Sequence, residues 1–146
     1  MYTAQFTEVD VAASQDLFQI AANTSTVVLH SVNISQSSDV GDAAAENLSL
    51  RVVRVTDAVV DEVTEVKLDA NDAAAFADIA ANTVTELSTG LETIHSETWN
   101  IALPFILLPP PEMRAQANPG TTLVVNLNSV PADTITMSGT VYFEER

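Results

Sequence analysis

The alternation of apolar and polar residues is clearest near the end of the chain. One parity there is shared by Ile135, Met137, Gly139, Val141 and Phe143, with threonine, serine and tyrosine between them. This period of two predicts a strand with one buried face. The run 122–127 alternates similarly, and turn residues fill 128–133, so we expect the two runs to form an antiparallel pair.

Earlier runs have the same character. Residues 16–21 and 26–35 are separated by a short polar link, and the first half of the second run is apolar at both parities, which indicates burial on both faces. In the run 48–55 the apolar parity changes between Val52 and Val53, which predicts a β-bulge or a strand that crosses between packing layers. Further strands are expected at 63–68, 83–87 and, more strongly, 93–103.

Two segments break the alternation. The alanine-rich stretch Asn71–Ala81 has Asn71 or Asp72 as a plausible cap and predicts a short helix packed by Phe76 and Ile79. The segment 104–111 combines an apolar cluster with three consecutive prolines, which favour extended polyproline geometry and cannot lie in a central strand.

Eight to ten short strands in 146 residues, with no long linker and no repeat, predict one domain over 1–146. We expect an all-β, single-domain antiparallel β-sandwich or jelly roll with one short helical insertion. The order of the strands does not follow from the sequence.

The composition then excludes several kinds of chemistry. The chain has no cysteine, so disulfides, thiolate catalysis and thiolate zinc sites are excluded. Its start lacks a basic segment followed by an apolar one, and no stretch is apolar for long enough to span a membrane, so we expect a soluble product made in the cytoplasm of the cell.

Charge narrows the possible partners. The chain carries 20 Asp and Glu against 5 Lys and Arg, a formal net charge of −15. Such a surface repels nucleic-acid phosphates and anionic lipids, so neither nucleic acid nor a membrane is an expected partner. The acidity either keeps the protein soluble or meets a basic partner. Arg51 and Arg54 are expected to pair with local carboxylates.

The histidines do not form a catalytic motif. His30 and His95 lie far apart in the sequence, and no zinc-binding or nucleophile motif accompanies them. His30 shares an apolar face and is expected in the core or an interface. His95 has the strand parity of Glu97 and Trp99, so it is either a half-exposed strand residue or an imidazole oriented by a carboxylate. We therefore assign no catalytic residue and no enzymatic activity.

Metal and sugar sites have weak candidates. The loop 37–42 with Glu46 offers the carboxylates of Asp39, Asp42 and Glu46, a calcium-like oxygen cluster without the spacing of a calcium loop. Turn formation explains the same residues, so we assign no metal and no cofactor. Trp99 with Tyr142 is the one plausible sugar-binding platform, and core packing explains Trp99 better.

The apolar cluster before the prolines needs a place to be buried. It comprises Phe105, Ile106, Leu107 and Leu108, followed by Pro109, Pro110 and Pro111. The cluster either packs beneath its own domain as an edge strand or contacts another subunit, where rigid prolines lower the ordering cost of association.

Three segments carry a resemblance: YTAQFTEVDVAASQDLFQI, QSSDVGDAAAENLSLRVVR and PADTITMSGTVYFEE. Together they resemble small virion structural proteins of tailed bacteriophages, of the capsid decoration (cement) type. The segment 57–90 is outside the resemblance. None of the three segments contains a catalytic motif.

The resemblance implies a β-sandwich or jelly-roll homotrimer on the capsid surface of the virion, bound to the major capsid protein. The contact residues expected on this basis are 105–111 and an amino-terminal arm, 1–6, with Tyr2 and Phe6. The alternative is a receptor- or glycan-binding β-sandwich module of a phage tail or baseplate.

Overall fold

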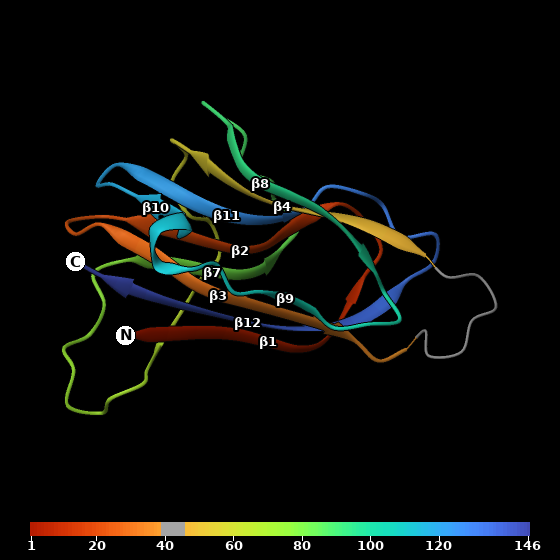
Figure 1. Cartoon of the computed structure of the whole chain (residues 1–146), viewed down its shortest axis with the longest axis horizontal. Coiled ribbons are helices and arrows are strands. Elements are labelled where there is room, and N and C mark those ends of the chain that lie inside the picture. Colours follow the sequence, from red (N-terminus) through yellow and green to blue (C-terminus); the bar gives the residue numbers. More distant parts are fainter. Residues whose placement is uncertain (39–45) are drawn as a thin grey trace.

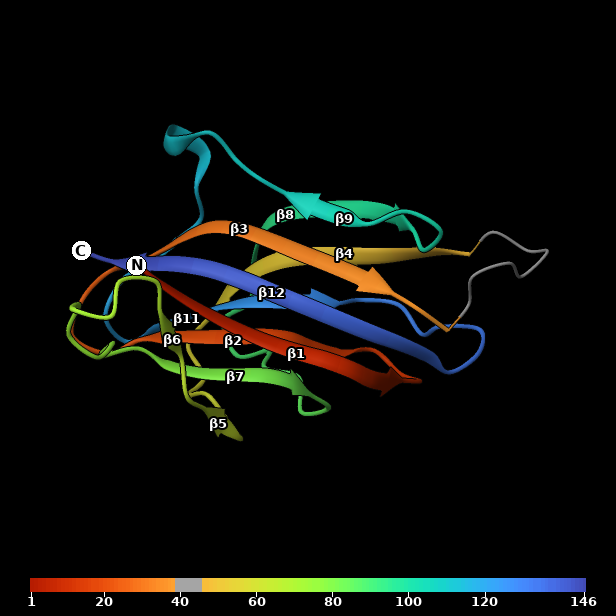
Figure 2. The same ribbon diagram turned by 90° about the horizontal axis from the view of Figure 1, so that it is seen from below.

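Two antiparallel sheets pack face to face in the computed structural model, which describes residues 1–38 and 46–146 (Figures 1 and 2). The first sheet, sheet A, has the order β10-β3-β12-β1-β6, and β9 also pairs with β3. Its strands are β1 (Tyr2–Val11), β3 (Val27–Gln36), β6 (Val66–Lys67), β9 (Phe105–Leu107), β10 (Gln116–Ala117) and β12 (Ile135–Glu145).

Sheet B has the order β5-β7-β2-β11-β4-β8. Its strands are β2 (Gln15–Ala22), β4 (Asn47–Val55), β5 (Glu62–Val63), β7 (Asp78–Thr83), β8 (Glu92–Asn100) and β11 (Thr121–Leu127). The expected all-β sandwich is therefore confirmed. The pair predicted from the last two alternating runs is wrong, because β11 lies in sheet B between β2 and β4, whereas β12 lies in sheet A between β1 and β3.

The core fills the space between the sheets. The alternating residues of β12 point into it, and Phe143 is fully buried against Tyr2, with ring centroids 5.4 Å apart. Phe6 of β1 reaches across to Phe18 of β2, with centroids 5.3 Å apart. Large side chains from both sheets thus interlock, as tight packing of a sandwich requires.

The outer face of sheet B is also covered. Val53, Val55 and Val124 form a second apolar cluster with Leu87, which lies in the connection between β7 and β8. The parity change at Val52 and Val53 is explained by this second layer, since Leu48, Leu50 and Val52 face the main core. A register shift occurs at the same point, but the extra residue is Ile94 of β8, whereas β4 pairs with β11 without interruption. The bulge expected within 48–55 is therefore wrong: β4 alternates regularly, and its second half is apolar toward the outer layer instead of the main core.

The predicted helix at 71–81 is wrong. Residues 69–72 form a turn closed by a hydrogen bond from Asp72 N to Asp69 O, and Asp78–Thr83 is strand β7, which pairs with β2. Phe76 is 62% exposed and supplies no helical packing contact, whereas Ile79 is buried opposite Ile20. Pairing with β2 therefore overrides the helical propensity of the alanines. The only helix in the described part of the chain is the 3-10 turn η1 (Pro111–Met113).

A close contact between strands β12 and β1 makes Gly139 a test of this core. A Cβ atom at Gly139 would lie 2.5 Å from Phe6 Cε1 and 2.9 Å from Ile34 Cδ1. We expect Gly139→Ala to lower the free energy of unfolding by about 1–3 kcal/mol, because the packed ring has no room to move. Urea unfolding measures this. Thr140→Ser, on the outward face of the same strand, is the matched control, and equal stability of the two variants would contradict the prediction.

Candidate functional site

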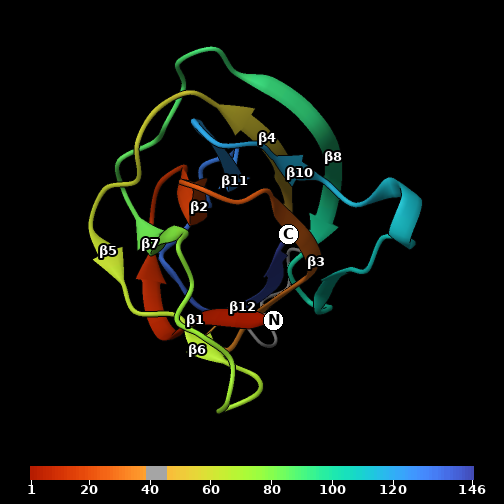
Figure 3. The same cartoon turned by 90° about the vertical axis from the view of Figure 1, so that its left-hand side faces the viewer.

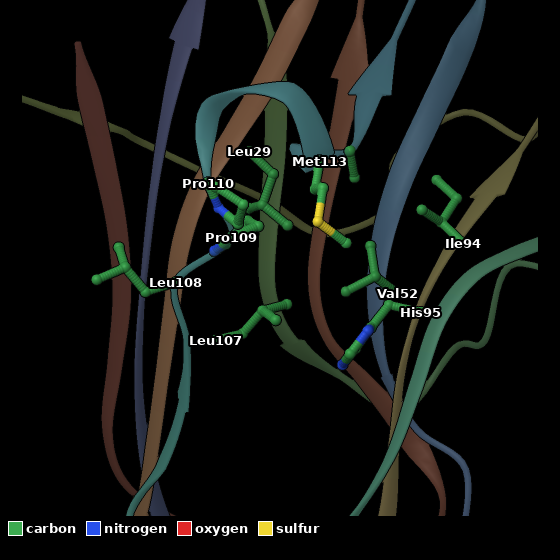
Figure 4. A pocket seen from close by; sticks show the side chains of 10 residues that line it. Leu29, Val52, Ile94, His95, Leu107, Leu108, Pro109, Pro110 and Met113 are labelled. Atoms are coloured by element: carbon green, nitrogen blue, oxygen red, sulfur yellow. The ribbon is translucent and has the colours of Figure 1, made fainter.

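An apolar pocket opens between strand β8 of sheet B and the segment 105–115 of sheet A (Figure 4). Its volume is about 220 Å³. It is lined by Leu29, Val52, Ile94, His95, Leu107, Leu108, Pro109, Pro110, Met113 and Ala115. His95 is the one side chain of this lining that can hydrogen-bond, so the pocket suits an apolar group with a single polar contact.

The prolines shape the sheet A side of this pocket. Phe105, Ile106 and Leu107 pair with β3, and the following prolines end that pairing because they cannot donate to a ladder. The chain then turns through η1, which stands away from β3 in Figure 2, and returns where Leu29 N donates to Ala115 O at 2.9 Å. The result is an arch, residues 105–115, whose Pro110 and Met113 overhang the pocket (Figure 4).

The arch divides the predicted apolar cluster. Phe105 is 5% exposed and packs edge-on against Trp99, with ring centroids 6.5 Å apart. Leu107 and Pro109 are half-buried, whereas Pro110 and Pro111 are exposed. Ile106 and Leu108 are 62% and 72% exposed. Part of the cluster is thus packed beneath its own domain as an edge strand, and part faces solvent.

The expected amino-terminal contact arm is wrong for this fold. Residues 2–11 form β1, which lies between β12 and β6 in sheet A. Tyr2 and Phe6 are each 8% exposed, because their parity points into the core. Neither side chain is available to another subunit.

His95 and Glu97 lie as their parity predicts. His95 Nε2 is 3.3 Å from Glu97 Oε2, on the face of β8 that also carries Trp99. Trp99 is 4% exposed and donates from Nε1 to Leu103 O at 2.6 Å. The indole is therefore a core residue, as preferred from the sequence, and does not offer a platform to a sugar.

His30 lies beside a carboxylate at the outer face of sheet A. Its Nε2 is 3.1 Å from Glu144 Oε2, close enough for an ion pair, yet the angle does not make a hydrogen bond. Burial alone would raise the pKa of Glu144, but the hydrogen bond from Arg146 and the charges of His30 and Arg146 together lower it. This cluster stabilises the end of β12, and none of its three residues lines the pocket.

A buried polar cluster, which sequence reasoning missed, lies on the outer face of sheet B. Asp16 is fully buried, and its Oδ2 accepts hydrogen bonds from Leu87 N at 2.9 Å and Gln19 Nε2 at 2.8 Å. Its Oδ1 accepts from Asn126 Nδ2 at 2.8 Å. Burial raises the pKa of Asp16, and these hydrogen bonds offset that only in part. In the sequence, Asp16, Gln19 and Asn126 are polar residues within otherwise apolar runs, and this pattern could have indicated a buried polar cluster.

Because Asp16 is sealed from solvent, this cluster is structural. It holds the connections that cover sheet B, since Gln19 also donates to Thr85 O at 2.9 Å and accepts from Val60 N at 3.2 Å. Arg51 joins it through Asn126 Oδ1 at 2.7 Å, so its expected carboxylate partner is replaced by an amide. Arg54 does pair with a carboxylate, that of Glu92, at 2.9 Å.

The possible calcium loop, with Asp39 and Asp42, lies outside the described residues. Glu46 is described, and its Oε1 accepts from Ala132 N at 2.7 Å. Within 1–38 and 46–146 no group of three or more His, Asp or Glu side chains is arranged to hold a metal ion. The same residues contain no helix long and apolar enough to cross a membrane.

Comparisons with known proteins identify no relative of this chain. No family model, no curated protein and no solved structure matches the chain.

The Asp16 cluster is open to a direct test. Both carboxylate oxygens of Asp16 accept hydrogen bonds, so in Asp16→Asn the amide NH₂ group would face a donor in either orientation of the side chain. We therefore expect the free energy of unfolding to fall by about 1–3 kcal/mol. Asp133→Asn, at an exposed position, is the matched control and should change stability by less than about 0.5 kcal/mol. Denaturant unfolding at neutral pH compares them; an unchanged midpoint for Asp16→Asn would show that the cluster does not hold the fold.

The lowered pKa of Glu144 predicts that its contribution to the stability of the folded protein depends on pH. The ionised carboxylate is favoured in the folded protein, so its stabilisation is present above the ordinary value of 4.5 and is lost as the pH falls through the folded pKa. We expect Glu144→Gln to be less stable than the wild type at neutral pH by up to about 1 kcal/mol, and the difference to shrink in acid. Thermal melts across pH measure this, and a constant difference would refute it. Glu62→Gln, exposed on β5, is the control.

Proposed function

We propose that this chain is a virion structural protein: a capsid decoration, or cement, protein that binds the outer capsid shell as an oligomer and stabilises it. The observation that carries the proposal is the arch, whose prolines hold Ile106 and Leu108 in solvent at one edge of the sandwich. The resemblance in the sequence supplies the biological setting.

The arch is suited to binding a surface. Burying one large aliphatic side chain contributes roughly 1.5–3 kcal/mol, and prolines reduce the ordering cost that association otherwise incurs. Ile106 is also held by the pairing of its strand with β3. A rigid apolar edge of this kind favours a protein partner over a small substrate.

The partner we propose is the major capsid protein, and the protein would act at the capsid surface after synthesis in the host cytoplasm. Bound subunits that straddle neighbouring capsid proteins would oppose the internal pressure of packaged DNA. Many contacts of modest strength sum to a stable shell when they are linked in one lattice. The net charge of −15 supports this location over one in contact with the DNA itself.

Chemistry at the pocket gives no support to an enzyme, since the residues that line it include no hydroxyl and no carboxylate. The buried Trp99 likewise removes the observation that favoured a glycan-binding module of a tail or baseplate.

Co-sedimentation with expanded capsid shells of the same phage tests the proposal. We expect the wild type to bind, and the double substitution Ile106→Asp with Leu108→Asp to weaken binding roughly tenfold or more, because two apolar contacts are lost. Val130→Asp, at a residue 64% exposed in the β11–β12 connection, is the matched control. Thermal melts verify that each variant folds.

Absence of wild-type binding would refute the capsid function. Undiminished binding by the double variant would instead show that the arch is not the contact.

A further inference from the structure

Strand β8 is a long edge that nothing in the described part of the chain covers. It forms one margin of sheet B, with β4 on its inner side, and the end-on view in Figure 3 places it at the rim of the molecule. Residues 92–98 are exposed except for His95, which is half-buried. The other margins are formed by β5, β6, β9 and β10, each two or three residues long. A nine-residue edge with free backbone groups is a ready template for another strand.

The sequence of β8 is complementary to itself in one antiparallel register. When two copies pair about Ser96, His95 of each copy faces Glu97 of the other. The flanking pairs are Ile94 with Thr98, Thr93 with Trp99 and Glu92 with Asn100, so no two like charges are opposed.

Charge discriminates this register from its neighbours. Pairing centred on Glu97 would place two carboxylates directly opposite each other, which is destabilising. Pairing centred on Thr98 would set Glu97 against Trp99 and give it no imidazole from the other copy. Only the register about Ser96 gives each of the two carboxylates a second imidazole, in addition to the one 3.3 Å away in its own chain.

The surroundings of β8 also favour a copy of this chain as the occupant. Association of two molecules with net charge −15 is least opposed where cations gather. Three of the five Lys and Arg residues lie here: Arg51 and Arg54 on β4, and Arg114 at a surface hollow shared with Arg54 and Ile94. Beside the edge, Ile94 is 39% and Met113 70% exposed, which provides apolar area to bury.

We infer that two copies of this chain associate through their β8 strands, antiparallel about Ser96, joining the two B sheets into one continuous sheet. The interface is two-fold and closed, so it ends at a dimer. It differs from the three-fold association that the resemblance implies, and it does not depend on capsid binding.

Light scattering coupled to size exclusion tests the inference at physiological ionic strength over a dilution series. The wild type should have a mass near twice the 15.5 kDa of one chain. His95→Glu opposes carboxylates across the interface, and Glu97→Lys replaces the carboxylate that faces His95 of the other copy with an ammonium group, so each variant alone should elute with the mass of one chain.

An equimolar mixture of the two variants provides the decisive comparison. In the mixed pair Glu at position 95 faces Lys at position 97, and His95 faces Glu97, so the double mass should return. Gln5→Glu and Glu62→Lys make the same charge changes on exposed positions of β1 and β5 and should leave the dimer intact. A wild type with the mass of one or three chains, single variants that stay dimeric, or a mixture that stays dissociated would each overturn the inference.

Hydrogen exchange gives a second test that needs no substitution. Amides of β8 should exchange more slowly at high than at low protein concentration, whereas amides of β5 should not change. Exchange in β8 that is independent of concentration would also overturn the inference. Capsid binding is measured separately, by co-sedimentation of the variant at Ile106 and Leu108. The dimer and the capsid function can therefore be refuted independently of each other.

Discussion

Burial of sheet B on both faces is the constraint on which the rest of the molecule depends. Its inner face packs against sheet A, so the connections that follow β4 and β7 must cover its outer face. These connections have little regular structure, and their backbone groups require partners in a layer without water. Asp16 and Gln19 supply them, which explains why a carboxylate is tolerated where burial raises its pKa.

The connections cover only part of the outer face of sheet B, and the part left uncovered includes the candidate surface at β8. The connections lie over β2, β11 and the second half of β4, and they stop short of β8. On sheet A the prolines end the pairing of β9 after three residues, so the arch stands out instead of closing over the gap. The two sheets therefore meet at an open seam, with an edge strand on one side and the arch on the other.

Local patterns predicted what depends on local chemistry. Alternation in β12 and β3, the change of apolar face along β4 and the orientation of His95 toward Glu97 follow from strand parity alone. The helix expected at 71–81 failed because alanine propensity is weak and pairing of Ile79 with Ile20 decides the structure. The partners of β11 and β12 could not be predicted, since the seven-residue link 128–134 permits both a hairpin and a crossing between sheets. The Asp16 cluster joins groups from segments that are far apart in the sequence, and a pattern of alternating residues within one segment cannot predict such contacts.

The acidic charge of the molecule and its open seam together restrict which strands can pair with β8. A strongly acidic surface keeps copies apart almost everywhere, which guards against the random edge-to-edge association that a bare strand invites. Glu97 and the bulge at Ile94 add to that protection on β8 itself. The same features would make association selective: a partner must satisfy Glu97 and accept the twist at Ile94, and few strands do both. An exposed edge of this composition is therefore better explained as a surface for a specific partner than as one left bare by chance.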